Sequence, residues 1–421
     1  MCSERDIFLD VAGELAHGLA ASALWHGDRC NWVGAVPLDH ARSPRAIASL
    51  GPDLYGGTSG VALFLAEAGT QLDDDGLRDA ARGAIRHSLD HARRIRPEHR
   101  HGLYLGTVGV VYAAARISGQ LDSRAVVSGA GELLRDWHAD VTRPASADVM
   151  SGCAGAILGL LAVAELNDSP WLVAAATRMG EELLVRARTA PAGWSWAQPG
   201  QRSMHHLCGF SHGAAGVGLA LAELFAATGD DRFGHAAERA FDYERSWLDP
   251  DTGVWPDLRG VGHAAGRDVP APTAGSWCNG AAGIALSRLR AAELLGTEAL
   301  QRDAELALAA CALRCDELLA HAPRDFSLCH GAAGIGDVLL QTAAGTGDRR
   351  ARLATAIGRH GIDHRGPAAA FLPCGVPHGV TPGLFLGLAG MGMFYLRLSD
   401  PLISGVLRVG PGTLTAAPAR P

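Results

Sequence analysis

The stretch that decides the fold is Ser327-Leu328-Cys329-His330-Gly331-Ala332-Ala333-Gly334. Two close relatives of it lie earlier, at Ser276-Trp277-Cys278-Asn279-Gly280-Ala281-Ala282-Gly283 and Gly209-Phe210-Ser211-His212-Gly213-Ala214-Ala215-Gly216. All three share a Gly-Ala-Ala-Gly frame, preceded by Cys-His, Cys-Asn and Ser-His respectively. A repeated frame with chemically different residues in front of it suggests a symmetric scaffold whose repeats converge on one site.

A looser Gly-x-x-Gly frame occurs seven times, each time leading into an apolar segment. The first glycines are Gly57, Gly106, Gly152, Gly213, Gly280, Gly331 and Gly387, separated by 49, 46, 61, 67, 51 and 56 residues. Glycine allows close backbone approach and positive φ, so seven helix starts can crowd around one axis. Their amide dipoles would favour anions such as thiolates there. For most copies the frame can equally serve only to pack helices.

Two kinds of helix alternate along the chain. The segments after the frames, such as 157–166 and 217–227, are apolar all round, which indicates burial. Between them lie amphipathic segments with the helical period. These are predicted at residues 5–25, 77–95, 170–188, 231–247, 298–321 and 348–359. The pattern predicts an all-α fold, an α/α toroid in which seven buried inner helices are wrapped by an outer ring.

The composition fits one large domain, which we place at residues 1–409, with a disordered tail at 410–421. Of the 421 residues, 48% are hydrophobic and 19% charged, and Ala and Leu outnumber β-branched residues, which favours packed helices. The net charge of -7 argues against sequence-independent nucleic-acid binding. Nine scattered cysteines, no signal core and no membrane-length apolar run predict a cytoplasmic protein.

Three long connections, at 190–210, 249–276 and 365–382, precede the fourth, fifth and seventh frames. Loops of this length in a compact domain are usually functional. We expect them to wall a cleft at the frames.

Cys278, Cys329 and His330 stand immediately before two consecutive frames. Two thiolates and one imidazole with a vacant fourth position form a known catalytic zinc arrangement. The toroid would bring Cys278 beside the other two, because it occupies the matching position one repeat earlier. The alternative is that these are small buried hydrophobes, which is how we interpret Cys311 and Cys315 on an outer helix. The same interpretation applies to Cys2, Cys30, Cys153, Cys208 and Cys374.

His212 and Asp148 are the acid–base candidates. His212 precedes the fourth frame, and Asp148 lies four residues before the first glycine of the third. On the same rim as a zinc ion, a histidine suits proton transfer. A structural histidine remains an alternative for His212, and a helix cap for Asp148.

Over residues 5–405 the chain resembles the lanthionine synthetase C-like cyclase family, in particular the cyclase domain of bifunctional lanthipeptide synthetases. The resemblance rests on Ser211-His212-Gly213, Trp277-Cys278-Asn279-Gly280, Cys329-His330-Gly331 and Asp148. It implies the seven-fold toroid, zinc binding by Cys278, Cys329 and His330, and an acid–base pair of His212 and Asp148.

The resemblance also implies a reaction. A cysteine thiol of a precursor peptide adds to dehydroalanine or dehydrobutyrine in the same peptide, and the resulting enolate is protonated. This would form lanthionine-type thioether rings in natural-product (RiPP) biosynthesis. The partners implied are a dehydrated precursor peptide and a separate dehydratase or kinase–lyase protein.

The chain departs from many stand-alone members at two positions. Asn279 stands where they carry tyrosine, and Ala274 where some carry arginine. Both changes bear on peptide or enolate contacts rather than on the metal set. The basic run 91–101 is a candidate site for an acidic leader peptide, although such a run is more often a solvated helix end.

Two other classes of function compete with the cyclase. One is a non-catalytic module that uses zinc to capture a thiol, such as glutathione or a cysteine peptide. The other is a different α/α-barrel enzyme, a zinc prenyltransferase or a glycoside hydrolase. Few aromatic residues and no opposed carboxylate pair at the frames disfavour this last class.

Overall fold

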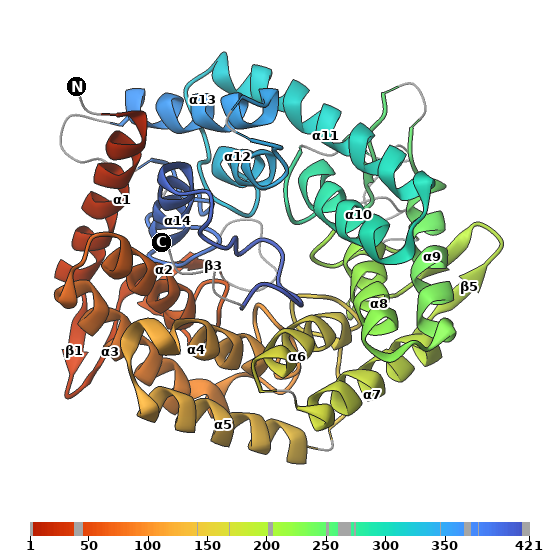
Figure 1. The fold of residues 1–421 in the computed structure, drawn as a ribbon, viewed down its shortest axis with the longest axis horizontal. Coiled ribbons are helices and arrows are strands. Elements are labelled where there is room, and N and C mark those ends of the chain that lie inside the picture. The colour runs from red at the N-terminus through yellow and green to blue at the C-terminus, as the bar shows by residue number, and fades with distance from the viewer. Residues whose placement is uncertain are drawn as a thin grey trace.

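The computed structural model describes residues 3–37, 45–140, 142–167, 169–200, 205–249, 252–259, 271–272, 275–345, 347–365, 372–377 and 379–414. In this part of the chain the helices form a double ring (Figure 1). The inner ring is α2 (Thr58–Gln71), α4 (Thr107–Leu121), α6 (Cys153–Asn167), α8 (Ala214–Thr228), α10 (Ala281–Leu295), α12 (Ala332–Gln341) and α14 (Leu388–Ser399). The outer ring is α1 (Glu4–Ala21), α3 (Asp75–His91), α5 (Arg124–Ala139), α7 (Pro170–Arg186), α9 (Asp231–Arg245), α11 (Glu298–Leu319) and α13 (Arg349–Asp363). The predicted seven-fold α/α toroid is confirmed.

The glycine frames start the inner helices. Each inner helix begins one residue after the first glycine of its frame, and those glycines are extended, as at Gly280 (φ -126°) and Gly331 (φ -93°). The second glycine lies against the carbonyl oxygen six residues earlier. A Cβ on Gly283 would lie 2.0 Å from the oxygen of Trp277, and one on Gly334 2.0 Å from that of Leu328. The frames are therefore needed for close backbone approach, and the positive φ that we also expected is not used there.

The ring closes through helix α1. The N-terminal helix serves as the outer partner of the last inner helix, α14, next to which it lies in Figure 1. Phe8 of α1 packs on Tyr395 of α14, with ring centroids 6.0 Å apart, and Glu4 pairs with Arg359 of α13. The two ends of the chain thus hold the toroid shut.

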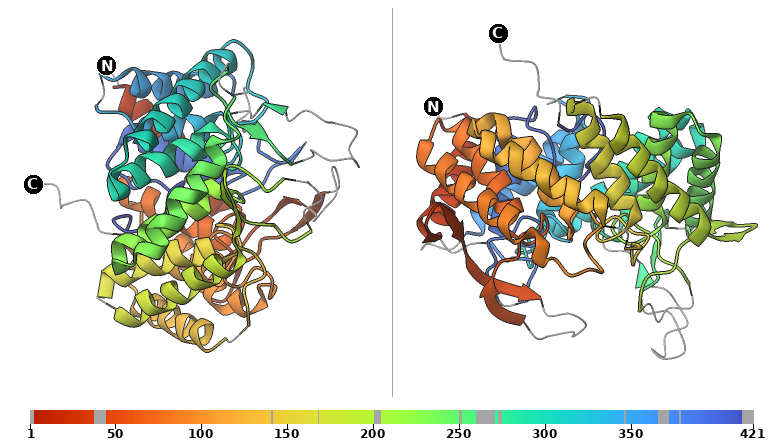
Figure 2. Two further views of the ribbon diagram at one scale, coloured as in Figure 1. Left: turned by 90° about the vertical axis from the view of Figure 1, so that its right-hand side faces the viewer. Right: turned by 90° about the horizontal axis from the view of Figure 1, so that it is seen from below.

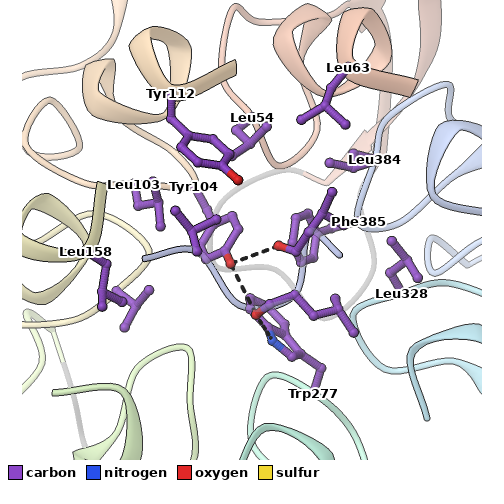
Figure 3. Close-up of a cluster of buried hydrophobic side chains, with 14 of the residues drawn as sticks. Leu54, Leu63, Leu103, Tyr104, Tyr112, Leu158, Trp277, Leu328, Leu384 and Phe385 are labelled. Atoms are coloured by element: carbon purple, nitrogen blue, oxygen red, sulfur yellow. Dashed lines mark hydrogen bonds between the residues drawn. The ribbon is translucent and has the colours of Figure 1, made fainter. Parts of the chain in front are cut away.

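The segment after α14 fills the centre of the ring. The hydroxyl of Tyr104 donates to the carbonyl oxygens of Val406 (3.1 Å) and Leu407 (3.3 Å), and Trp277 Nε1 donates to Leu407 (2.8 Å) (Figure 3). These donors satisfy backbone carbonyls that would otherwise be buried without a partner. The axis below the inner-helix starts is therefore a packed core and not a channel.

This packing continues into the residues expected to form a tail. Tyr112 donates to the hydroxyl of Thr413 (3.3 Å), which is 8% exposed, and the amide of Gly412 donates to Glu165 (2.6 Å). Residues 410–414 are thus part of the packed structure. The rest of the expected tail, 415–421, lies outside the described residues.

Short antiparallel hairpins project from the double ring, with β3–β4 and β7–β8 on one face and β5–β6 at the rim (Figure 2). They pair β1 (Leu24–His26) with β2 (Arg29–Asn31), β3 (Val33–Pro37) with β4 (Arg45–Ser49), β5 (Arg188–Ala190) with β6 (Gly193–Ser195), and β7 (Pro256–Asp257) with β8 (Ala271–Pro272). Two of the hairpins lie in long connections that we expected to be irregular. Other parts of those connections, 201–204, 260–270 and 366–371, lie outside the described residues. None of the helices that the structure describes is both long and apolar enough to cross a membrane.

The basic run 91–101 is a paired helix end. Helix α3 stops at His91 and a 3₁₀ turn follows. Arg93 then pairs with Asp136 (2.5 Å) and Arg100 with Asp140 (2.6 Å), both acidic partners at the end of α5. Arg93 and Arg100 are thus paired within the chain, Arg93 while 69% exposed, and binding of a leader peptide by this run stays a prediction.

Candidate active site

The residues before the frames form a ring of their own. We call the two residues that precede each first glycine a lip, and number the lips 1 to 7 in chain order. A backbone amide of each lip, or of the residue just before it, donates to a carbonyl of the next lip, and lip 7 donates to lip 1. The bonds are Tyr55→Tyr104 (2.9 Å), Leu105→Met150 (2.9 Å), Val149→Ser211 (3.2 Å), Ser211→Cys278 (2.8 Å), Cys278→Cys329 (3.3 Å), Cys329→Phe385 (2.9 Å) and Phe385→Tyr55 (2.9 Å). Residues at the same lip position are therefore neighbours in space, although roughly 50 residues separate consecutive lips in sequence.

The residue before each lip points into the core. These residues are Leu54, Leu103, Val149, Phe210, Trp277, Leu328 and Leu384, each at most 1% exposed. Figure 3 shows several of them gathered around the aromatic rings of Tyr104, Trp277 and Phe385. This apolar layer fixes the lips from below and leaves their other side chains for chemistry.

Cys278 and Cys329 hold the same position in lips 5 and 6, and their sulfur atoms hydrogen-bond to each other. The hydrogen bond from Cys329 outweighs burial and lowers the pKa of Cys278 to about 6, with further help from the charge of His330. The same bond, together with burial, raises the pKa of Cys329 well above 9. In the metal-free pair, Cys278 is therefore the thiolate and Cys329 the donor.

Each sulfur also receives a hydrogen bond from a neighbouring side chain. Tyr55 donates its hydroxyl to Cys329 Sγ (3.0 Å), and Asn279 donates Nδ2 to Cys278 Sγ (3.3 Å). Burial first, then the nearby sulfur charges, raise the pKa of Tyr55 well above 10, so its hydroxyl keeps its proton. Sequence reasoning gave neither residue this role.

His330 is oriented by a carboxylate that sequence reasoning missed. Its Nδ1 donates to Asp325, whose other oxygen accepts the amide of Ser327 (2.8 Å). Burial would lower the pKa of His330, but the hydrogen bond and charge of Asp325 outweigh it and raise the value. With Nδ1 engaged, Nε2 is the nitrogen available to a ligand, as in metal sites where a carboxylate holds the histidine.

His212 and Asp148 form a hydrogen-bonded pair. His212 Nδ1 lies 2.5 Å from Asp148 Oδ2; the carboxyl is 3% exposed and the imidazole 39%. Burial opposes charge on the ring, yet the charge and hydrogen bond of Asp148 raise the pKa of His212. The pair presents an imidazole to the outside with its Nδ1 fixed on a buried carboxylate.

The second oxygen of Asp148, Oδ1, has a capping role. Oδ1 accepts the amide of Ser151 (2.8 Å) in the turn before α6. Asp53 holds the same place before the first frame and accepts the amide of Gly56 in the same way (2.8 Å). One oxygen of Asp148 therefore serves the turn, as Oδ1 of Asp53 does, and the other serves His212.

A cation lies near this group. Arg259 is held by Asp257, with Nη2 2.7 Å and Nε 3.0 Å from the carboxylate oxygens, and its charge helps to lower the pKa of Cys278. Leu258, which comes just before it, packs with Leu207 and Cys208 near lip 4. The long connection before lip 5 thus brings the guanidinium of Arg259 close enough for its charge to act on Cys278.

The remaining cysteines match the packing interpretation. Cys311 and Cys315 are fully buried on α11, and burial raises the pKa of Cys315 to about 12. Burial also raises the pKa of Cys30 and of Cys153 to about 12. Cys2 and Ala274 lie outside the described residues.

The three candidate metal ligands, Cys278, Cys329 and His330, do not form a compact metal-binding cluster. Over the described ranges, no three His, Cys, Asp or Glu side chains are grouped as a ready metal-binding set. The two sulfurs hydrogen-bond to each other, and Asp325 holds Nδ1 of His330 and leaves Nε2 for a ligand.

Comparison with known proteins identifies the family of this chain. The family model described as lanthionine synthetase C-like protein matches residues 48–409. The chain belongs to this family. Among solved structures, this lanthionine synthetase C-like protein is similar to a nisin cyclase, with a TM-score of 0.61, 15% sequence identity, and coverage of 83% of this chain and 89% of that one. At that identity the likeness shows a shared fold.

A sugar epimerase from a ruminal bacterium scores lower, with a TM-score of 0.48 and 12% identity over 94% of this chain and 99% of that one. No curated protein matches the sequence. For this lanthionine synthetase C-like protein, the family assignment therefore rests on the family model, which spans the lips from the first to the last.

Proposed function

We propose that this protein is a zinc-dependent lanthionine cyclase, which adds a cysteine thiol of a peptide to a dehydroalanine or dehydrobutyrine residue of the same peptide. The observation that carries the proposal is the order of side chains on consecutive lips. Asp148 before lip 3 and His212 on lip 4 form a proton-transfer pair, and Cys278 and Cys329 on lips 5 and 6 form a sulfur pair beside it. Membership of the lanthionine synthetase C-like family supports the same reaction.

The donor set fits a zinc ion in its chemistry. Cys278, Cys329 and His330 offer two sulfurs and one imidazole nitrogen, a set that leaves a fourth position open. The two sulfurs hydrogen-bond to each other, and the pKa of Cys278 is lowered to about 6. Asp325 holds Nδ1 of His330, which leaves Nε2 to bind a metal ion. Zinc bound by these residues would hold a peptide thiol in its deprotonated form.

The protein's own side chains then handle the proton. The peptide sulfur forms a bond to the β-carbon, and the C=C electron pair moves onto the carbonyl oxygen. His212 has a raised pKa and so carries a proton over a wider pH range, and we assign its Nε2–H the protonation of the α-carbon. Asp148 keeps the ring oriented and stabilises its charge. Arg259 adds a positive charge where the enolate oxygen develops negative charge.

The test uses zinc-loaded protein and a dehydrated peptide that contains one cysteine. Ring closure is an isomerisation, so the peptide mass stays constant while its free thiol disappears, and iodoacetamide labelling followed by mass spectrometry scores the loss. We expect His212→Ala to slow ring closure roughly 10²- to 10⁴-fold with zinc content unchanged. His26→Ala, on the exposed hairpin strand β1, is the matched control.

The outcomes separate the candidate functions. If wild-type protein binds zinc and the peptide thiol but leaves the thiol count unchanged, it is a thiol-binding module. If His212→Ala closes rings as fast as wild type, the proton-transfer role is wrong. If no zinc is retained, the proposed cofactor is wrong.

The chemistry also constrains the partners. The peptide must already contain a dehydrated residue when it arrives, so a dehydrating enzyme has to act before this one, and we propose a separate protein for that step. We expect both to act in the cytoplasm, where the thiols of the peptide stay reduced.

A further inference from the structure

Each sulfur of the site has its own hydrogen-bond donor, and the two donors come from different lips. Tyr55 reaches Cys329 from lip 1, and its ring stacks on Phe385 with centroids 4.9 Å apart and planes at 12°. Asn279 reaches Cys278 from the adjacent position on lip 5 and is 5% exposed. Both donors are therefore held in place by packing before any metal or peptide binds.

The proposed reaction creates a selectivity problem at this point. With zinc and a peptide thiol in place, three sulfurs would lie next to one electrophilic alkene. If a protein sulfur attacked, a bond would form between it and the β-carbon, the C=C electron pair would move to the carbonyl oxygen, and a proton from water would complete the adduct. The product would be a permanently alkylated enzyme.

We propose that Tyr55 and Asn279 are positioning residues that suppress this self-alkylation, each by donating a hydrogen bond to one protein sulfur. A hydrogen bond to an anionic sulfur withdraws electron density and occupies the direction of a lone pair. The peptide sulfur, which lacks such a donor, would then be the best nucleophile of the three. The inference rests on the proposed zinc site and assigns a use to Asn279, one of the two positions singled out in the sequence as departures.

The test measures alkylation of each cysteine separately. Zinc-loaded wild type, Tyr55→Phe and Asn279→Leu are treated with N-ethylmaleimide, an alkene acceptor that reacts by the same conjugate addition. Timed samples are digested and the adducts mapped by mass spectrometry. We expect Tyr55→Phe to speed adduct formation at Cys329, and Asn279→Leu at Cys278, each by about tenfold, since a hydrogen bond to a charged group has a net strength of this order.

The controls isolate the hydrogen bond from general loosening. Tyr112→Phe removes another buried hydroxyl, which donates to Thr413 (3.3 Å) on the opposite side of the packed core. It should change neither rate. Adducts at Cys311, buried on α11, monitor unfolding in the same digests, and Asn279→Ala replaces Asn279→Leu if the latter loses zinc.

The outcomes are distinct. Sulfur-specific acceleration in each variant supports the inference. Equal acceleration at both sulfurs, or none, in variants that retain zinc overturns it and leaves the proposed cyclase intact. A wild-type chain that retains no zinc overturns the proposed function and this inference together.

Discussion

Replacement of Asp148 by Asn tests how far the proton-transfer pair depends on a buried charge. In the structure Oδ1 accepts the amide of Ser151 (2.8 Å) and Oδ2 lies 2.5 Å from Nδ1 of His212. An asparagine that keeps the first bond turns its NH₂ group towards the ring. His212 Nδ1 must then accept a hydrogen bond from this NH₂ group, so the neutral ring carries its proton on Nε2. A second proton, on Nδ1, would point an N–H group of the ring at the NH₂ group of the asparagine.

The magnitude follows from the kind of bond that is lost. A hydrogen bond to a charged group is worth roughly 1–2 kcal/mol more than a neutral one, and we take about 1 kcal/mol because the His212 side chain is 39% exposed. The pKa of His212 should fall, since the carboxylate that raises it is gone. Ring closure should slow roughly 10²- to 10⁴-fold, because less of the imidazole carries both protons and a neutral ring is a much weaker acid at Nε2.

The sign of the pH dependence distinguishes this charge pair from a simple packing contact. The raised pKa of His212 contributes stability that is present below about pH 6.5 and is lost as pH rises through the folded-state value. The lowered pKa of Asp148 contributes stability that is present above about pH 4 and is lost as pH falls through its own value. The wild type should therefore exceed Asp148→Asn in stability most between about pH 4 and 6.5.

Two measurements check this, with a matched control. Urea unfolding at about pH 5.5 and about pH 9 should show a difference that shrinks at the higher pH. NMR titration of His212 should show a lower midpoint in the variant. Asp53→Asn removes a carboxylate from the same turn position and should leave the His212 titration unchanged. An unshifted His212 midpoint in Asp148→Asn would refute the reasoning.

Three further variants test the scaffold by urea unfolding. Trp277→Phe removes the shorter of two hydrogen bonds to the buried carbonyl of Leu407 (2.8 Å) and should cost about 1–3 kcal/mol, whereas an unchanged midpoint would show that the remaining donor, Tyr104 (3.3 Å), suffices. Glu244→Gln leaves the fully buried Arg288 without its nearest carboxylate (2.7 Å) and should cost about 3–5 kcal/mol; a cost below 1 kcal/mol would mean that the other acidic neighbour suffices. Gly209→Ala forces a side chain into a φ of +96° and against the backbone of lip 5 (2.6 Å), so it should cost at least about 1–3 kcal/mol and slow ring closure.

The repeat pattern predicts much of the fold because it is local in origin. The two glycines of each frame predict where an inner helix starts, and each inner helix begins one residue after the first of them. The matching positions of Cys278 and Cys329 also predict that they become neighbours, since adjacent repeats of a closed ring must touch. What the glycines do is steric, and the structure was needed to show that the second one makes room for a carbonyl.

Other features depend on contacts between distant segments and leave no local signal. Asp325 precedes His330 by five residues in an irregular turn, a spacing that carries no periodicity. Tyr55 reaches Cys329 across lip 7, from the other end of the chain. Residues 410–414 have the composition of a tail, yet Tyr112 donates to Thr413 and the amide of Gly412 donates to Glu165.

The ring of backbone hydrogen bonds explains why chemistry can concentrate on one side of a nearly symmetric scaffold. Because amides and carbonyls join the lips, the side chains are not needed for closure and differ from lip to lip. Lips 7, 1 and 2 carry aromatic rings that build the core, whereas His212, Cys278 and Cys329 lie on the consecutive lips 4, 5 and 6, and Asp148 lies just before lip 3. The amide of Ser211 on lip 4 donates to the carbonyl of Cys278 on lip 5 (2.8 Å), so the proton-transfer pair lies on the Cys278 side of the sulfur pair. We therefore expect the alkene of the peptide to lie between His212 and Cys278, where sulfur addition and protonation of the α-carbon can follow each other without movement of the peptide.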